Sequence, residues 1–267
     1  MAKILIGCPT HAGDLSAQTF HSITTTHSCM GHEVSFNVIG LSLLARNFST
    51  LFLSAFNNGY DYFFLHHADI GFAAESNSLS WLDLMVQRIE ELQAAALSVV
   101  SPIKNEAGHT STGLIMDKNN VYNLRRVTIK ELELLPKPFI SRSHICKLFD
   151  VDPDVAGALL VNTAGLLMDL KGYDWTKWPG FEIRDEIIWN KSSYGTVRTI
   201  PEDWNMSAWM HENGFPFYAT KEIAAHHIGQ KDWTNYGSRG YPTDDQKREC
   251  PREEWESSTE PKRKTDA

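Results

Sequence analysis

An apolar segment that ends in polar residues runs Tyr60-Asp61-Tyr62-Phe63-Phe64-Leu65-His66-His67-Ala68-Asp69-Ile70-Gly71-Phe72. Residues 60–65 predict a strand, because aromatic and aliphatic side chains dominate a run of strand length. The strand ends abruptly in two histidines and a carboxylate. In an α/β sheet, ligands bind beyond the carboxyl ends of the strands. The segment therefore predicts a sheet strand together with one wall of a binding site.

Outward from this strand, segments of strand character alternate with segments of helical spacing. The alternation predicts an α/β fold built on a parallel, doubly wound sheet. Its ligand-facing loops would be 9–14, 66–72 and 101–105. The expected strands cover 3–9, 33–39, 60–65 and 98–103, and the expected helical segments cover 15–30, 41–55 and 81–96.

Past Asn105 the apolar runs become shorter. An Asn119-Asn120 turn predicts a hairpin of residues 112–117 and 120–129. A strand and turn are expected over 158–170, and amphipathic helical stretches near 184–190 and 202–213. We expect one domain over 1–236, composed of two halves (1–105 and 106–236), followed by a polar tail (237–267) too poor in apolar residues to pack.

The composition favours a folded unit of the size of an enzyme. The chain has 267 residues, of which 42% are hydrophobic, so it can bury a substantial core. Its apolar runs are too short to cross a bilayer, and its first residues resemble a strand more than a signal peptide, so a cytoplasmic location in a cell or viral host is expected. Four scattered cysteines indicate reduced thiols, and the net charge of −8 disfavours a sequence-independent nucleic-acid binder.

The segment around Asp69 resembles the DxD region of GT-A-fold glycosyltransferases, close to the family 2-like enzymes. His67 stands at the position of the first Asp and Asp69 at that of the second. The resemblance implies a mixed sheet with flanking helices, and a Mn²⁺ or Mg²⁺ ion on Asp69. It also implies a catalytic domain in which residues 1–105 form the nucleotide-sugar half and residues 106–236 the acceptor half. A divalent cation held by a carboxylate neutralises the diphosphate leaving group of a nucleotide sugar, here expected to be a UDP-sugar. The alternative is a purely structural role, in which Asp69 caps a helix.

Further expected contacts to the nucleotide lie elsewhere in the first half. Arg46, in Leu43-Leu44-Ala45-Arg46-Asn47, resembles the family's Arg-Asn element near the nucleotide, although such an Arg can instead extend into solvent. Pro9 and Thr10 match the position where the family contacts the nucleobase. Lys104 follows a strand and could pair with phosphate, or could simply face water.

In the second half, Pro201-Glu202-Asp203-Trp204 opens a predicted helix and resembles the family's Glu-Asp motif. The resemblance implies that Asp203, beside Glu202, is the general base that deprotonates the acceptor. The helix dipole should hold its carboxylate ionised, although an acidic first turn is also ordinary helix chemistry.

His227, before Ile228-Gly229, matches the family's late metal-binding histidine, and His226 is then a core or supporting residue. Gly165 resembles the family's small-residue loop beneath the sugar, where the backbone approaches a ligand; turn geometry is the alternative. A competing acidic cluster, which we expect on a solvated helix face, consists of Glu182, Asp185 and Glu186.

The resemblance implies a metal-dependent glycosyltransferase that inverts the configuration at the anomeric carbon. Its acceptor is open: a glycan is expected, or a hydroxymethylated base of viral DNA. Two other functions fit the same residues. One is a GT-A-like module that binds a nucleotide sugar without turnover. The other is a hydrolase with a metal centre of His66, His67, Asp69, His226 and His227. A basic patch for DNA, or an ordinary charged surface, would consist of Arg125, Arg126, Lys137, Arg142 and Lys147.

Overall fold

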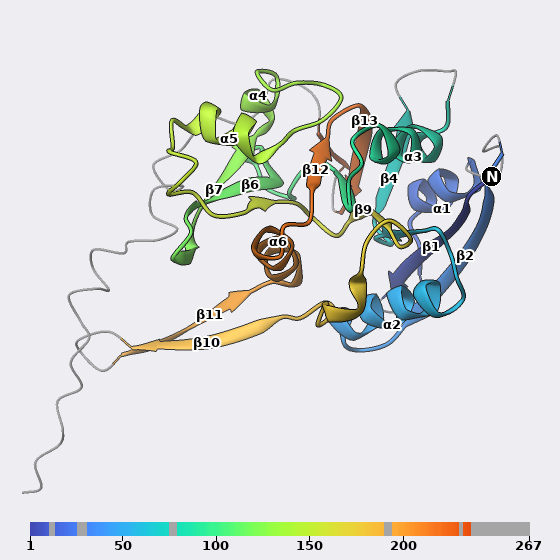
Figure 1. The fold of residues 1–267 in the computed structure, drawn as a ribbon, viewed down its shortest axis with the longest axis horizontal. Helices are drawn as coiled ribbons and strands as arrows, with labels where there is room; N and C mark the ends of the chain where they lie inside the picture. Colours follow the sequence, from blue (N-terminus) through green and yellow to red (C-terminus); the bar gives the residue numbers. More distant parts are fainter. Residues whose placement is uncertain (11–13, 26–30, 75–78, 190–193, 230–231, 236–267) are drawn as a thin grey trace, which may run out of the picture.

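The computed structural model describes residues 1–10, 14–25, 31–74, 79–189, 194–229 and 232–235 (Figure 1). The predicted tail, 237–267, lies outside the described residues. So does the end of the helix predicted over 15–30, of which the structure describes α1 (Ala17–Thr24). No helix within the described ranges is both long enough and apolar enough to span a membrane.

In the part of the chain that the structure describes, the largest sheet has six strands in the order β12-β5-β9-β3-β1-β2. β1 is parallel to β2 and β3, and β12 is parallel to β5. β9 runs antiparallel to both β3 and β5. The strands are β1 (Lys3–Thr10), β2 (Glu33–Gly40), β3 (Tyr62–His66), β5 (Ala96–Val99), β9 (Gly165–Asp169) and β12 (Phe217–Thr220).

The prediction of a mixed α/β sheet with flanking helices is therefore confirmed, with a Rossmann-like arrangement of the first strands. The narrower prediction of a wholly parallel sheet is wrong. β9 is the reason, since its Leu166, Leu167 and Met168 are fully buried and form a central strand that returns in the opposite direction. Its backbone hydrogen bonds are satisfied on both edges, by β3 and β5.

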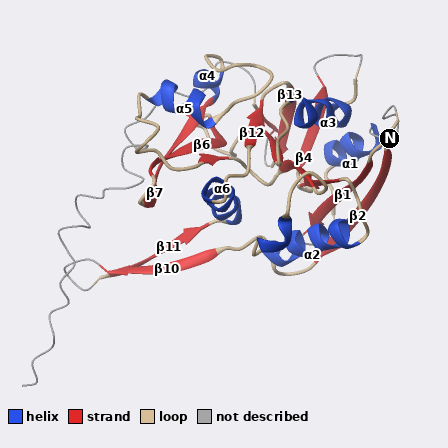
Figure 2. Cartoon of the chain, in the orientation of Figure 1, coloured by secondary structure: helices blue, strands red, loops and turns tan. Residues whose placement is uncertain are grey.

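Both faces of the sheet are covered (Figure 2). Leu5, Phe63 and Leu65 belong to the core formed with α2 (Leu44–Asn57). Ile4, Ile6 and Phe64 alternate with them and pack with α3 (Trp81–Glu91) on the other face. The two-residue repeat of a strand accounts for this division, because successive side chains point to opposite faces. α3 ends at Glu91, before the predicted residue 96, and Gln93, with φ 47°, follows it before β5 begins at Ala96.

Smaller sheets flank the central one. β6 (His109–Asp117) and β7 (Asn120–Thr128) form the predicted hairpin and pair with β8 (Leu159–Leu160). β4 (Ile70–Ala74) pairs with β13 (Ile223–Ile228), which pairs with β14 (Asp232–Thr234). The remaining helices are α4 (Ile129–Leu132), α5 (Arg142–Phe149) and α6 (Glu202–Glu212), with a 3₁₀ turn over Trp175–Lys177.

The helix predicted over 184–190 is wrong. Residues Arg184–Trp189 form β10, which pairs with β11 (Gly195–Ile200) as a hairpin that projects from the body in Figure 1. Ile187 lies opposite Val197, and these side chains are 64% and 66% exposed, so one face of the hairpin is apolar and open. The other face carries Glu186, which accepts a hydrogen bond from Tyr122 Oη at 2.7 Å.

Candidate active site

The carboxyl end of β3 meets two later segments of the chain. Asp69 follows β3, and the backbone N–H of Ile228 donates to its carbonyl oxygen at 2.7 Å. In the same register, His227 of β13 lies opposite Ile70 of β4. β1 ends at the same edge, because it is parallel to β3. Burial first, and the charge of Asp69 second, raise the pKa of the buried Cys8 thiol to about 12. Residues distant in sequence thus converge at this edge of the sheet.

Asp69 is paired by two cationic or potentially cationic side chains. Its Oδ2 lies 3.2 Å from His227 Nε2 and 2.6 Å from Lys104 Nζ. Burial alone would raise the pKa of Asp69, but the hydrogen bonds from His227 and Lys104, with the nearby imidazoles, hold it well below its usual range. The carboxylate therefore stays ionised across the physiological range, as a cation ligand requires.

The ring of His227 is oriented from behind by the backbone. Its Nδ1 lies 2.8 Å from the carbonyl oxygen of Pro102, which can only accept, so Nδ1 carries hydrogen and donates. Nε2 faces a carboxylate oxygen of Asp69, which likewise only accepts, so Nε2 donates in this contact, and a metal ion bound at Nε2 would replace that hydrogen. Histidines that bind metals in proteins are commonly fixed in this way, by donating the second N–H to a carbonyl.

His67 connects the end of β3 to the start of α6. Its Nε2 lies 3.3 Å from Thr163 Oγ1, and the Thr163 hydroxyl donates to Glu202 Oε1 at 3.1 Å. Because that hydroxyl has one hydrogen, it accepts from His67 Nε2–H, which leaves Nδ1 of the neutral ring as an acceptor. Burial lowers the pKa of His67 to about 4, so the ring is neutral at pH 7. The ring also stacks at an angle on Phe48 of α2, with centroids 5.2 Å apart.

Asp203 lies in the first turn of α6, next to the buried Glu202. Burial and then the neighbouring Glu202 raise the pKa of Asp203 to about 7, against the opposing effects of Arg126 and of the Trp204 N–H, which donates to its Oδ1 at 2.9 Å. The expectation that the helix dipole keeps this carboxylate firmly ionised is therefore wrong, because loss of solvation outweighs the dipole. A pKa near 7 suits a group that accepts a proton at neutral pH.

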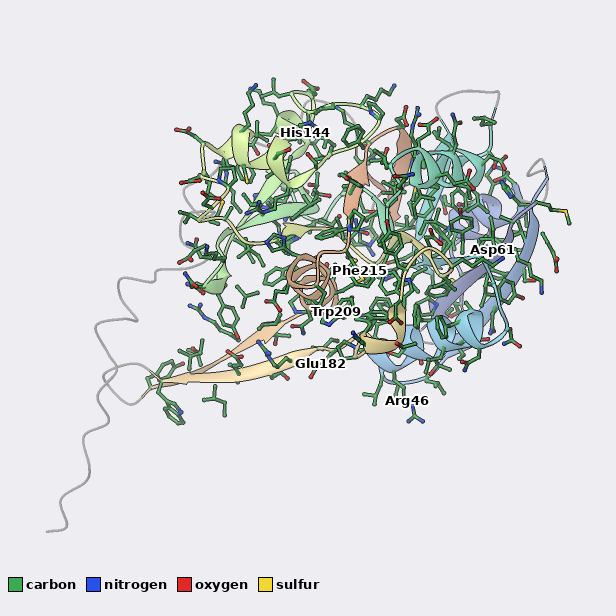
Figure 3. The ribbon with its side chains drawn as sticks, viewed as in Figure 1. Arg46, Asp61, His144, Glu182, Trp209 and Phe215 are labelled. Atoms are coloured by element: carbon green, nitrogen blue, oxygen red, sulfur yellow. The ribbon has the colours of Figure 1, made fainter. Side chains whose placement is uncertain are left out.

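α6 is held in place by polar and aromatic contacts. The Ser207 hydroxyl donates to the Asp203 carbonyl at 2.7 Å, and the N–H of Val161 donates to that hydroxyl at 3.1 Å. At the other end of the helix, Trp209 and Phe215 pack together with ring centroids 5.0 Å apart (Figure 3). These contacts fix the first turn of α6 beside the loop that carries Thr163.

Two other histidines of the proposed hydrolase centre, His66 and His226, have different surroundings. His66 is fully buried, where its Nε2 contacts Ser22 Oγ at 3.1 Å and its Nδ1 donates to the His67 carbonyl at 2.9 Å. His226 lines a separate hollow of about 370 Å³ with His21 and Gly71, against α1. Among the described residues there is no group of three or more His, Cys, Asp or Glu placed to hold a metal ion, so the five-residue hydrolase centre is not assembled.

The nucleotide contacts expected in the first half divide into two cases. Pro9 and Thr10 are buried at the end of β1, on the edge where Asp69 lies. Arg46 is exposed, and Figure 3 shows its side chain directed away from the body of the molecule. The neighbouring Asn47 is buried in its place, donating to the Leu41 carbonyl at 3.0 Å. Arg46 therefore extends into solvent, which was the alternative to its expected position near the nucleotide.

Packing in the protein interior requires a glycine at position 165. A Cβ at this position would lie 2.4 Å from Cζ of Phe72. Gly165 was expected to let the backbone approach a ligand, but the group that approaches it is the ring of Phe72. Thr163, two residues earlier, is the residue of this loop that faces the site, and its hydroxyl between an imidazole and a carboxylate had no distinct signal in the sequence.

The competing acids and the basic residues are largely engaged within the chain. Glu186 is paired with Tyr122 and lies 3.2 Å from Arg184. Arg125 pairs with Glu131 at 2.5 Å, and Arg142 donates to the carbonyls of residues 156 and 157 at 2.7 and 2.6 Å. Two members of the supposed basic patch thus support loops of the protein.

No protein-family model matches the chain, and no curated protein matches it. The structure is similar to the crystal structure of A197 from STIV, with a TM-score of 0.45 and 10% sequence identity, over 90% of this chain and 97% of that chain. A likeness of this degree does not assign a function.

Proposed function

We propose that the protein is a metal-dependent glycosyltransferase that moves a sugar from a nucleotide sugar, in first place a UDP-sugar, to an acceptor hydroxyl. The observation that carries the proposal is the meeting of Asp69 and His227, 158 residues apart in sequence, at the carboxyl edge of the sheet. Both positions were expected from the resemblance to GT-A-fold glycosyltransferases. Their contact supports the proposal independently of the two sequence motifs, which do not show that the residues are close in space.

The chemistry of this pair suits a divalent cation. Asp69 offers an ionised carboxylate, and His227 offers Nε2 as the nitrogen that a cation would take in place of hydrogen, because Nδ1 donates to Pro102. Mn²⁺ and Mg²⁺ accept such oxygen ligands, and Mn²⁺ also accepts imidazole, with the phosphate oxygens of the substrate completing the set. When bound, the cation would neutralise the charge that develops on the departing nucleoside diphosphate.

The protein's own residues would bind the rest of the donor. His67 presents Nδ1 as a hydrogen-bond acceptor, which suits a hydroxyl of the ribose or of the sugar. Lys104 is close enough to Asp69 to reach a diphosphate bound there. Pro9 and Thr10, at the end of β1, would border the nucleobase as the resemblance implies.

Asp203 would accept the proton of the acceptor hydroxyl. In an inverting reaction, the acceptor oxygen forms a bond to the anomeric carbon while the bond from that carbon to the diphosphate oxygen breaks. The hydroxyl proton passes to the carboxylate of Asp203, and the electron pair of the broken bond leaves with the nucleoside diphosphate. The contacts from His67 through Thr163 to Glu202, the neighbour of Asp203, support a position of this base beside the donor.

Calorimetric titration with UDP tests the proposal. We expect binding in Mn²⁺ that is at least tenfold weaker in EDTA, and weak binding in both conditions for Asp69→Asn. Equal affinity in Mn²⁺ and EDTA would remove the metal from the proposal. Metal-dependent binding of UDP-sugars without transfer to any of a panel of glycan and hydroxymethylated DNA acceptors would favour the binding module.

A further inference from the structure

The segment after β5 acts on both members of the Asp69–His227 pair. The carbonyl of Pro102 accepts from His227 Nδ1, and Lys104 Nζ lies on Asp69 Oδ2. The backbone of this segment is held to the start of β6, since the N–H of Ile103 donates to the His109 carbonyl at 2.9 Å. The position of Lys104 relative to Asp69 is therefore set by a fixed backbone and a long side chain.

The side chain of Lys104 has room to leave Asp69. Its side chain is 34% exposed and that of Asp69 is 45% exposed, so the ion pair lies at the surface of the site. Along its path, the stem passes Gly229, where an added Cβ would lie 3.2 Å from Lys104 Cδ. The absence of a side chain at Gly229 leaves space for the stem, and the ammonium lies at the end of a flexible chain of four carbons.

Two groups already approach the same carboxylate oxygen. Lys104 Nζ lies at 2.6 Å from Asp69 Oδ2 and His227 Nε2 at 3.2 Å. An ammonium has hydrogens to donate but no lone pair, so it cannot join a cation as a ligand. A divalent cation shared by Asp69 and His227 would be repelled by an ammonium on the same oxygen, because like charges at short range oppose each other.

We propose that Lys104 is a built-in counter-cation that a divalent metal must displace from Asp69, and that the displaced ammonium then binds the diphosphate of the donor. The inference rests on the proposed function and adds a competition at its metal site. Lys104 keeps the Asp69 carboxylate paired while donor and metal are absent. It therefore opposes the binding of metal alone and favours the binding of nucleotide with metal.

The two effects have opposite signs, which makes Lys104→Met a sharp test. Methionine retains much of the length of the stem and removes the charge. Titration with Mn²⁺ alone should show about 2- to 5-fold tighter binding than in the unmodified protein, the range for removal of a partly exposed ion pair. Titration with UDP in saturating Mn²⁺ should show weaker binding by a similar or larger factor. Lys147→Met, at an exposed position on α5, is the matched control and should change neither constant.

Unchanged or weaker Mn²⁺ binding in Lys104→Met would overturn the inference, provided that thermal unfolding shows the variant folded. A lack of Mn²⁺ binding in both proteins would overturn it too, by removing the competition. Failure of the proposed function would look different. Tighter Mn²⁺ binding in Lys104→Met, with no affinity for UDP in either protein, would support the competition at Asp69 and remove the nucleotide sugar.

Discussion

Replacement of Asp203 by asparagine should slow sugar transfer and, at high pH, stabilise the fold. Asparagine has nearly the same shape but cannot accept the acceptor's proton at neutral pH. If Asp203 is the base, transfer should fall by about 10²- to 10⁴-fold while the dissociation constant of the donor changes little. In the unmodified protein, transfer should rise with pH and level off above an apparent pKa of about 7.

The same substitution should stabilise the fold at high pH. The pKa of Asp203 is raised from 3.8 to about 7 in the folded protein, so folding favours the protonated form. Stability is therefore lost as the pH rises from about 4 through 7. At about 1.4 kcal/mol per unit, the full cost of ionising this group is about 4 kcal/mol, and linkage assigns about 2 to 3 kcal/mol of it to the interval between pH 5 and pH 8.

Urea unfolding of both proteins at pH 5 and pH 8 measures this difference. Asp203→Asn should gain about 2 to 3 kcal/mol relative to the unmodified protein on going from the lower to the higher pH. Other effects of the substitution, such as a weaker interaction with the helix dipole, largely cancel in this comparison. A pH-independent difference would refute the raised pKa. Near-normal transfer by Asp203→Asn, together with a collapse in the control Glu186→Gln, would place the base on β10.

Two further substitutions test the arrangement around β4 and β13. His227→Ala should weaken Mn²⁺-dependent UDP binding at least tenfold while His226→Ala leaves it nearly unchanged, because His227 Nε2 lies 3.2 Å from Asp69 and His226 lines a separate hollow; equal losses in calorimetry would contradict this assignment. Gly165→Ala should lower the unfolding free energy by about 1 to 3 kcal/mol in urea, because the new methyl would overlap the ring of Phe72; an unchanged midpoint would show that the ring moves aside without cost.

The sequence was informative where the signal was local. A strand of apolar residues ending in His67 and Asp69, and a helix opening at Glu202, follow from periodicity and from the position of polar residues, and the structure has both elements there. The contact between Asp69 and His227 depends on pairing of β4 with β13. Such pairing is set by packing between distant segments, so its prediction required a family resemblance.

The errors fall where tertiary contacts decide between two local possibilities. The amphipathic stretch 184–190 suits a helix, but pairing with β11 places Ile187 opposite Val197 and makes the segment a strand. The antiparallel direction of β9 could not be predicted from the sequence either. A strand that is buried on both faces is a continuous apolar run, here Leu166-Leu167-Met168, in whichever direction it runs. Arg46 could pair or extend into solvent, and no local feature distinguished the two.

His67 stands where the GT-A-fold glycosyltransferases that this sequence resembles have an acid. The side chains around position 67 explain why a histidine suits it. The Thr163 hydroxyl gives its hydrogen to Glu202, whose side chain is buried, and it needs a donor for its own lone pair. His67 Nε2–H supplies that donor. An aspartate at position 67 has no hydrogen to give, and it would add a negative charge near a carboxylate whose pKa burial already raises. A neutral imidazole therefore satisfies Thr163, avoids repulsion with Glu202, and still offers Nδ1 to a hydroxyl, so the departure from the acidic pattern is compatible with binding of a sugar nucleotide.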